Sequence, residues 1–499
     1  MLAVRCRPSS FYSLRRVLLK HHVRAEKAPT GRASLFHTST RVAKAGVNES
    51  TDTLIGKYIA VKDNIVTADQ PTIASSRILD GYTSPFDATV VKQLRAAGAA
   101  ISSKASLDEF GMGSHSQTAF EGAVRSPFTR NGEALSPGGS SGGSAVAVAD
   151  KSAWAALGTD TGGSVRLPAA YCGVVGFKPS YGRLSRWGVI QYANSLDTVG
   201  VLAGSVADAE SVFEKLDHHD ARDPTSLPAT LRKRLMPCNK EQPGPLRIGI
   251  PREYNISELT PPVHNTWISA LSALRSAGHT LVPVSLRTTR QALSAYYVLA
   301  PAEASSNLAK YDGIRYGQRT PGSDASPAEG LPLYAKTRGE GFGEEVRQRI
   351  LLGAYALSSE AIDNYFIQAQ KVRRLVQRDF DRVFIARNPL IEPTEMPELE
   401  GVAAVDILIT PTAPTLPPTI AGLKRQTSVE SYMLDVFTVP ASLAGLPAIS
   451  VPVPLSPALR DSMDKHDVRS VGIQILGQFG TDSLVLHAAK VLEGIYAQP

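Results

Sequence analysis

The chain of 499 residues contains only three cysteines and no long apolar run. Cys6, Cys172 and Cys238 are far apart in the sequence and form no CxxC pair, which excludes a disulfide framework and a cysteine metal site. Cys172 lies in an apolar stretch, and we expect it to be a buried small side chain. Because no apolar run approaches the roughly 20 residues that a transmembrane helix needs, we expect no membrane span.

Common nucleotide-binding motifs are missing as well. Gly142 and Gly143 are not followed by the lysine of a Walker loop, and the dinucleotide pattern GxGxxG is absent from this glycine-rich stretch. No cluster of metal-binding residues stands out in the sequence. We therefore expect no cofactor and no metal ion in this chain.

Positive charge is concentrated at the amino terminus. Residues 1–48 contain ten Lys or Arg against Glu26 alone, a balance of +9, so the remainder carries +7 − 9 = −2. That balance does not indicate a general nucleic-acid-binding face, although it leaves a local patch open. The same segment is Arg-rich, Ser-rich and amphipathic, which is typical of a mitochondrial transit peptide. We predict a transit peptide and lead-in over residues 1–45 and a location in the mitochondrial matrix; the alternative is a basic tail.

Residues 46–499 are predicted to form a single large α/β domain, because strand-like apolar runs alternate with helical patterns. Strands are expected at 58–61, 99–104, 246–251, 279–284 and 405–412, with a late pair at 451–454 and 471–476. Helices are expected at 90–98, 199–216, 264–277 and 359–385, and a loop over 318–345.

Two Gly/Ser turns, residues 138–144 and 158–166, are the most distinctive feature. Glycine has no Cβ, so such turns let the backbone approach another group closely and present N–H groups and hydroxyls together. The segment between them, residues 145–157, is apolar and long enough for a helix and a short strand. Its expected burial argues against a flexible linker, the usual interpretation of Gly/Ser-rich sequence.

The first turn contains the pattern GxSxG at 138–142 and again at 139–143, which raises an α/β-hydrolase elbow as one possibility. Such an elbow needs a strand directly before the serine and a later histidine. The preceding residues are a poor strand, and His466 and His487 fit surface or helix positions. Lysine as the base is the second possibility: Lys62 follows an apolar strand, and burial lowers the pKa of an amine. A hydroxyl could then relay a proton between Lys62 and a nucleophile, unless Lys62 is simply a solvated side chain.

Three stretches together, residues 138–144, 158–170 and 172–183, resemble the amidase signature family, and the resemblance extends from about residue 54 to the carboxyl terminus. It implies a central mixed β-sheet covered by helices on both faces. It also implies that Ser164 is the nucleophile, that Ser140 is a relay serine held by a cis peptide, and that Lys62 is the base. The backbone N–H groups of Thr161, Gly162 and Gly163 would form the oxyanion hole.

Within that family the chain resembles the glutaminase subunits of tRNA-dependent amidotransferases, through residues 296–298, 303–308, 312–317 and 341–349. Matching positions imply that Tyr296, Arg349 and Asp435 bind free glutamine. The chemistry is compatible, because a site for an α-carboxylate and an α-ammonium needs an Arg fork and a carboxylate. Without the resemblance, Arg349 and Asp435 would be interpreted as ordinary helix residues.

The resemblance further implies a heterotrimer that contains a B subunit, with a small third subunit beside it. Ammonia released from glutamine would pass to the B subunit, which uses ATP and Mg²⁺ to convert Glu-tRNA(Gln) to Gln-tRNA(Gln) and makes most of the tRNA contacts. Two alternatives stay open at this point. One is a free-standing amide hydrolase with the same triad, and the other is an inactive assembly subunit.

Overall fold

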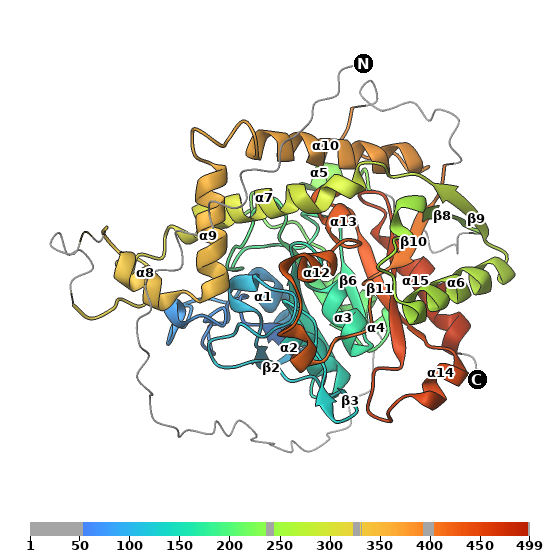
Figure 1. The fold of residues 1–499 in the computed structure, drawn as a ribbon, viewed down its shortest axis with the longest axis horizontal. Coiled ribbons are helices and arrows are strands. Elements are labelled where there is room, and N and C mark those ends of the chain that lie inside the picture. Colours follow the sequence, from blue (N-terminus) through green and yellow to red (C-terminus); the bar gives the residue numbers. More distant parts are fainter. Residues whose placement is uncertain (1–52, 236–243, 323–329, 331, 393–403, 498–499) are drawn as a thin grey trace. The chain divides into compact units, whose positions relative to one another are not determined.

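A ten-stranded mixed sheet forms the centre of the protein in the computed structural model, which describes residues 53–235, 244–322, 330, 332–392 and 404–497. The strand order is β2-β1-β5-β7-β6-β11-β12-β10-β8-β9 (Figure 1). The strands are β1 (Tyr58–Lys62), β2 (Ala100–Ala105), β5 (Ala155–Asp160), β6 (Val175–Lys178), β7 (Thr198–Ala203), β8 (Arg247–Pro251), β9 (Thr280–Val284), β10 (Ile407–Pro411), β11 (Ala448–Pro454) and β12 (Ser470–Leu476). A separate small hairpin pairs β3 (Thr129–Arg130) with β4 (Glu133–Ala134).

Alternation along the strands directs apolar side chains to both faces of the sheet. In β1, Ile59 and Val61 join one buried cluster while Ala60 joins another, as the two-residue period of a strand requires. Both faces are therefore apolar, and helices cover both, as predicted. The first face carries α1 (Thr89–Ala96), α4 (Val206–Leu216), α6 (Pro261–Ser276) and α15 (Asp482–Ala497). The second carries α2 (Gly142–Ala149), α3 (Arg166–Cys172), α7 (Thr289–Leu308), α9 (Glu344–Ala356), α10 (Phe366–Val383) and α13 (Val439–Ala444).

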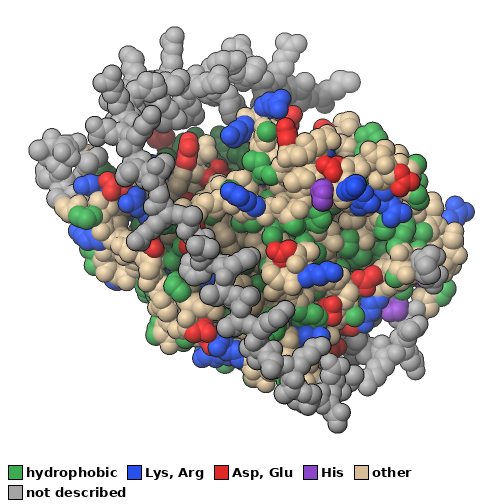
Figure 2. All heavy atoms as spheres, turned by 90° about the horizontal axis from the view of Figure 1, so that it is seen from below, with side chains coloured by type: hydrophobic (Ala, Val, Ile, Leu, Met, Phe, Trp, Pro, Cys, Tyr) green, Lys and Arg blue, Asp and Glu red, His purple; other side chains and the backbone are tan. Residues whose placement is uncertain are grey.

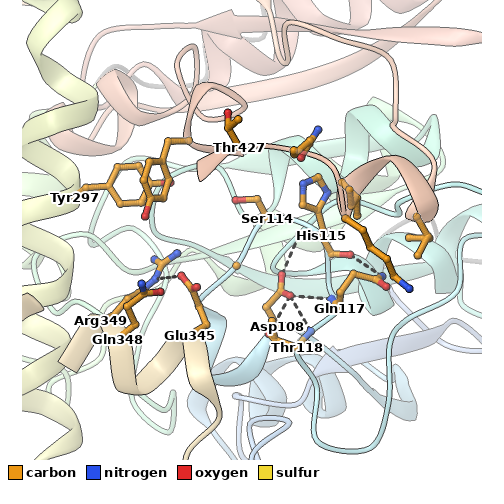
Figure 3. Close-up of a pocket in the computed structure, with 16 residues that line it drawn as sticks. Asp108, Ser114, His115, Gln117, Thr118, Tyr297, Glu345, Gln348, Arg349 and Thr427 are labelled. Atoms are coloured by element: carbon orange, nitrogen blue, oxygen red, sulfur yellow. Dashed lines mark hydrogen bonds and ion pairs between the residues drawn. The ribbon is translucent and has the colours of Figure 1, made fainter. Parts of the chain in front are cut away.

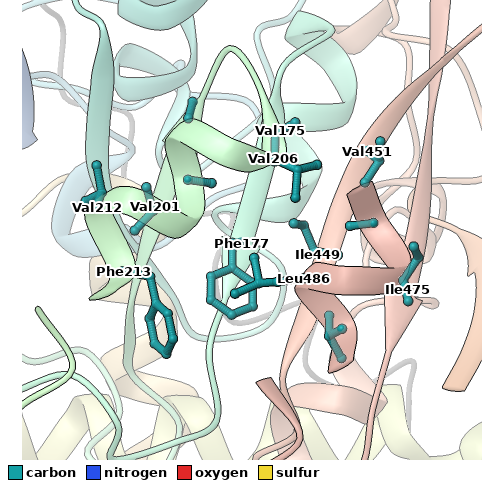
Figure 4. Close-up of a cluster of buried hydrophobic side chains, with 14 of the residues drawn as sticks. Val175, Phe177, Val201, Val206, Val212, Phe213, Ile449, Val451, Ile475 and Leu486 are labelled. Atoms are coloured by element: carbon teal, nitrogen blue, oxygen red, sulfur yellow. The ribbon is translucent and has the colours of Figure 1, made fainter. Parts of the chain in front are cut away.

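The core on the first face lies between the sheet and helices α4 and α15 (Figure 4). Phe177 of β6 meets Phe213 of α4 edge-on, with 5.2 Å between ring centroids. Such a pair adds about 1 kcal/mol beyond simple burial. This packing keeps the central strands rigid, and the functional groups described below extend from the ends of those strands.

Several element predictions are confirmed, including the strands at 58–61 and 99–104, the helix over 90–98 and the antiparallel late pair. The helix predicted over 199–216 was half wrong: residues 198–203 form β7, and α4 begins only at Val206 after the N-cap Ser205. The β7 segment is buried throughout at the centre of the sheet, where small and branched apolar residues suit a strand.

Two further boundaries differ from the prediction. The expected loop over 318–345 includes α8 (Ala335–Gly341) and the start of α9, and the long helix expected from 359 begins at Phe366. The shorter helices are α5 (Ala229–Arg232), α11 (Ile420–Leu423), α12 (Ser428–Met433) and α14 (Pro457–Ser462), with single 3-10 turns at Arg77–Leu79, Glu109–Gly111 and Arg252–Tyr254.

The predicted transit peptide lies outside the described residues, so its boundary at residue 45 stays a prediction. Residues 52–499 form one compact unit. Cys172 is 1% exposed, as expected. Within the described ranges, no helix has both the length and the apolar character needed to cross a membrane.

Candidate active site

Strands β1 and β5 are parallel neighbours, so their carboxyl ends meet at the same edge of the sheet. Lys62 is the last residue of β1, and Asp160 is the last residue of β5. The second Gly/Ser turn follows β5 directly, and the first turn leads into α2, which packs beside the same two strands. The topology thus brings Lys62 together with two turns whose serines lie 78 and 102 residues further along the sequence (140 − 62 and 164 − 62).

Lys62 is fully buried, which rules out the solvated alternative. Its Nζ lies 2.8 Å from Ser140 Oγ and 2.9 Å from Ser141 Oγ, and it donates to the Thr159 carbonyl at 3.3 Å. Burial lowers the pKa of Lys62 to about 7, although the carboxylates of Asp108, Asp160 and Asp197 oppose that shift. A lysine in this state can accept a proton near neutral pH.

The first turn presents Ser140 after a cis peptide between Gly139 and Ser140, as the resemblance implied. Close packing explains its glycines: a Cβ on Gly138 would lie 2.7 Å from Pro168 Cα. Ser116 holds the turn through two hydrogen bonds: its Oγ donates to the Gly138 carbonyl at 2.9 Å and accepts from Gly142 N at 3.0 Å. The linker interpretation is therefore wrong for this segment.

Asp108 in turn holds the loop that carries Ser116. Its carboxylate accepts from the backbone N–H groups of Ser116 and Gln117 at 2.8 and 2.9 Å, and from the Thr118 hydroxyl at 3.1 Å. Its own N–H donates to the Ser140 carbonyl at 3.2 Å. One buried carboxylate thus ties the loop over 115–118 to the serine turn.

Ser164 lies in the second turn and is 9% exposed. Its carbonyl accepts from Ser141 N at 3.1 Å, which joins the two turns. Within the described part of the chain, Ser164 Oγ has no hydrogen-bond partner, and neither have the N–H groups of Gly162 and Gly163. Free N–H groups beside a free hydroxyl are what an oxyanion hole next to a nucleophile requires.

A buried ion pair between Asp160 and Arg166 holds the two ends of the second turn together. Arg166 and Asp160 are both fully buried, and Arg166 Nη2 and Nε contact the carboxylate at 2.8 and 2.9 Å. Arg166 also donates to the Thr438 carbonyl at 2.9 Å and to Gln474 Oε1 at 2.7 Å, so the guanidinium is well satisfied. The pair anchors the turn to the segment that carries Asp435.

The three predicted glutamine-binding residues come from separate segments that converge beside the second turn. Tyr296 on α7 packs on the glycine pair, since a Cβ on Gly162 would lie 2.7 Å from Tyr296 Cζ. Asp435 lies near Gly163, just after α12, and burial raises the pKa of its carboxyl to about 6. Arg349 on α9 donates to Tyr192 Oη at 2.6 Å and to Glu345 at 2.7 Å.

Tyr297, which the sequence interpretation missed, connects the last two of these residues. Its hydroxyl donates to Asp435 Oδ2 at 3.1 Å, and its ring lies 5.7 Å from the Arg349 guanidinium carbon. Ser114 donates to the same carboxylate oxygen at 3.3 Å. Adjacent positions on a helix point about 100° apart, so the choice between Tyr296 and Tyr297 depends on the rotation of α7, which the sequence does not reveal.

A cavity of about 460 Å³ opens in front of this cluster, and its size suits a small polar ligand. Figure 3 shows Glu345, Gln348 and Arg349 of α9 on one side of it and the loop from Ser114 to Thr118 on the other. Ser114 and Tyr297 line the cavity and both contact Asp435, whereas Lys62, Ser140 and Ser164 are not among its lining residues. Asp435 does not line the cavity either, so Asp435 and Ser164 both lie behind the layer of residues that includes Ser114 and Tyr297.

The elbow alternative does not fit these contacts. Ser140 Oγ and Ser141 Oγ both contact an amine, and neither His466 nor His487 reaches them among the described hydrogen bonds. The strand before the turn, β4, is moreover only two residues long and belongs to the separate hairpin with β3, not to the central sheet. In the same described ranges, no group of three or more His, Cys, Asp or Glu is placed to hold a metal ion.

Ser140 and Ser141 both touch the lysine, so their roles must be separated by substitution. Ser141 Oγ also donates to the Thr159 carbonyl at 3.3 Å, which occupies its proton. Ser140 Oγ accepts from Lys62 Nζ and donates to no acceptor among the described residues, so its proton is free for transfer. We expect Ser140→Ala to lower kcat by about 10²- to 10³-fold, within the usual range for a lost proton transfer. Ser141→Ala should cost less than about tenfold. Equal losses in a steady-state assay would show that the relay is assigned to the wrong serine.

The site contains a buried amine in contact with two hydroxyls, and the neighbouring turn presents a third serine and free N–H groups. Acyl transfer by a serine with a lysine base uses such a set of groups. Fold and site together are those of an amidase-type enzyme. The chain belongs to the amidase family, whose model, described as Amidase, matches residues 29–486. That match begins inside the predicted lead-in at 1–45.

Two curated relatives are similar over almost their whole length. One from Ajellomyces capsulatus is 56% identical over 90% of this chain and 91% of its own, and one from Emericella nidulans is 57% identical over 88% and 89%. Both carry the name of the mitochondrial A subunit of glutamyl-tRNA(Gln) amidotransferase. Among solved structures, the A subunit of glutamyl-tRNA(Gln) amidotransferase from Thermotoga maritima is 34% identical, with a TM-score of 0.68, and the match covers 90% of this chain and 86% of that one.

Proposed function

We propose that this chain is the glutaminase subunit of a mitochondrial glutamyl-tRNA(Gln) amidotransferase. The observation that carries the proposal is the fully buried Lys62, which contacts the Ser140 hydroxyl at 2.8 Å beside the turn that presents Ser164. The names of the similar relatives support the assignment to that enzyme and to mitochondria.

In the proposed reaction, Ser164 Oγ attacks the side-chain carbonyl carbon of glutamine. The hydroxyl proton passes to Ser140 Oγ while Ser140 gives its own proton to neutral Lys62. The negative oxygen of the tetrahedral intermediate accepts from backbone N–H groups of Thr161, Gly162 and Gly163, each worth about 3 kcal/mol of barrier. The C–N bond then breaks, the relay returns a proton to the leaving nitrogen, and ammonia departs. Water hydrolyses the glutamyl ester through the same relay and releases glutamate.

Charge complementarity supports glutamine as the substrate. Arg349 has one nitrogen, Nη2, with no partner among the described residues, and it lines the cavity. It could therefore hold the α-carboxylate. Asp435 would hold the α-ammonium, and because its pKa is about 6, it is mostly ionised at neutral pH. Tyr296 would pack against the turn that contains Gly162 and form one wall of the glutamine site.

The proposal assigns the remaining chemistry to other subunits. Ammonia would pass to a B subunit, which activates Glu-tRNA(Gln) with ATP and Mg²⁺, and a small third subunit would complete the complex. The direct test is glutamate release from glutamine, measured for the isolated chain and for the complex co-purified with the B subunit. Absence of glutamine hydrolysis in both preparations would overturn the proposal and favour an inactive assembly subunit.

Arg349→Ala is expected to raise the KM for glutamine and lower kcat/KM by about 10- to 150-fold. The reason is the loss of a charge-assisted hydrogen bond to the carboxylate, worth about 1.5 to 3 kcal/mol. Hydrolysis of a simple neutral amide should change much less, because that substrate has no carboxylate to bind. Arg349→Lys keeps the charge but not the planar fork, so its kcat/KM for glutamine should lie between those of wild type and Arg349→Ala.

The same pair of assays separates the proposed function from its rival. Should Arg349→Ala leave glutamine turnover unchanged while neutral aryl or acyl amides are cleaved well, the chain would instead be a free-standing amide hydrolase.

A further inference from the structure

The outward face of helix α10 carries a row of positive side chains, Lys371, Arg374, Arg378 and Arg382, which we call the α10 basic row. All four are exposed. The opposite face of the helix, with Ala369, Val376, Phe380 and Val383, is buried against α7 and α13. The row therefore faces away from the body of the protein, along the uppermost helix in Figure 1.

No acidic side chain forms an ion pair with the α10 basic row within the described residues. The polar contact that Arg374 makes is with the Gln377 side chain at 3.4 Å. The helix does contain two acids, but both face its flanks and have other hydrogen-bond partners. Asp379 accepts from Thr288 N at 2.7 Å, and Asp381 accepts from Asn388 and Gln478, each at 3.1 Å.

The positive charge of the α10 basic row contrasts with the charge of the rest of the protein. Residues 49–499 carry a net charge of −2, and on the face turned away from α10, drawn in Figure 2, positive and negative side chains are interspersed. An unpaired row of long, flexible cations contributes little to folding. It does create a positive potential over one side of the protein.

Spacing indicates the shape of the partner. With a rise of 1.5 Å per residue, the positions from 371 to 382 span about 16 Å in steps of about 4.5 to 6 Å. The cations form a line and do not converge on one point, so the row suits an extended polyanion better than a single phosphate. A membrane surface fits poorly, because an interfacial helix needs a free apolar face. Most of the apolar face of α10 is buried, and the two large apolar side chains exposed on this helix, Ile367 and Leu375, do not make such a face.

We infer that the α10 basic row binds the phosphate backbone of RNA, and that the RNA is the tRNA substrate of the complex. The inference rests on the proposed function for the identity of that RNA. Phosphate contacts position a nucleic acid without reading its sequence. This chain would thus add affinity for tRNA and orient it, while recognition of particular bases would lie elsewhere.

The test compares two fourfold variants in the assembled complex. The first is Lys371→Gln, Arg374→Gln, Arg378→Gln and Arg382→Gln. The control removes the same charge from four exposed cations elsewhere in the chain that form no ion pair within the described ranges, with Lys92→Gln, Arg275→Gln, Lys465→Gln and Arg469→Gln. Binding of fluorescently labelled tRNA(Gln) is measured by anisotropy at several salt concentrations, together with the KM for Glu-tRNA(Gln) and with glutamine hydrolysis in the absence of tRNA.

The α10 variant should bind tRNA at least about tenfold more weakly. Its plot of log affinity against log salt should be less steep by about 3 to 3.5, because four phosphate contacts are lost at roughly 0.7 to 0.9 of slope each. The control should change less than about twofold, and both variants should retain glutamine hydrolysis. Equal tRNA binding by the two variants would overturn the inference. So would loss of a subunit from the α10 variant on gel filtration, which would make the row a protein interface, or loss of binding to anionic vesicles without loss of tRNA binding.

The two proposals fail separately in this design. Weaker tRNA binding by the α10 variant, in a complex that hydrolyses no glutamine even as wild type, would support the RNA surface and overturn the proposed function. Normal glutamine-dependent amidation by the α10 variant, with unchanged tRNA affinity, would support the proposed function and overturn the RNA-binding surface.

Discussion

Ser164→Ala is expected to reduce glutamine hydrolysis by about 10³- to 10⁶-fold, the range seen when a serine hydrolase loses its nucleophile. The other two serine hydroxyls of the site, Ser140 and Ser141, already contact Lys62 and do not lie in the second turn. The substitution removes no hydrogen bond among the described residues, since Ser164 Oγ has no partner there. The thermal midpoint should therefore stay within about 2 °C of wild type.

A chemical bypass provides the control for this variant. In the assembled complex, Ser164→Ala should still support amidation of Glu-tRNA(Gln) when an ammonium salt replaces glutamine, because only the supply of ammonia is lost. Loss of the ammonium-dependent reaction would mean that the substitution damages the assembly. Robust glutamine hydrolysis by the purified variant would mean that Ser164 is not the nucleophile.

Lys62→Met should lower kcat by about 10²- to 10⁴-fold, because methionine fills much of the same volume but cannot accept a proton. Lys62→Arg should be similarly inactive, since a guanidinium stays protonated at any accessible pH. Both variants should remain folded, which circular dichroism would verify.

The wild-type pH profile tests the same assignment without substitution. Burial lowers the pKa of Lys62 to about 7, so about three quarters of the molecules hold the neutral amine at pH 7.5, against about 0.1% for an ordinary lysine. The neutral form is the base. The rate should therefore fall about tenfold per pH unit below 7 and reach a plateau above about 8. A rate that keeps rising to pH 10, or one that is flat from pH 6 to 9, would contradict a base with this pKa.

The residue types of the site could be predicted from the sequence, but the contacts between them could not. The Gly/Ser turns could be interpreted because glycine pairs exclude side chains, and the structure places Tyr296 and Pro168 in the space that a Cβ would need. Lys62 could be singled out because it ends an apolar strand. The parallel pairing of β1 with β5 brings Lys62 beside the second turn, and the hydrogen bond from Ser141 N to the Ser164 carbonyl joins the first turn to it. No local pattern reveals these contacts between distant segments.

Other features could not have been found from local sequence. The sequence predicts a helix where β7 lies, because small apolar residues suit both structures; burial at the sheet centre favours the strand. The supports from Asp108, Ser116 and Tyr297 depend on how loops and helices rotate against one another. The roles of Arg349 and Asp435 rested on resemblance alone. The structure brings both beside Tyr297, although their segments are more than 80 residues apart (435 − 349).

In the proposed mechanism, Ser164 forms a covalent bond to the side-chain carbonyl carbon of glutamine. The most direct measurement is the intact mass of the protein after incubation with a diazoketone analogue of glutamine, followed by peptide mapping. We predict one adduct per chain, on the peptide that contains Ser164, absent from Ser164→Ala and slowed in Lys62→Met. An adduct on Ser140 or Ser141, or no adduct from a preparation that hydrolyses glutamine, would contradict the account.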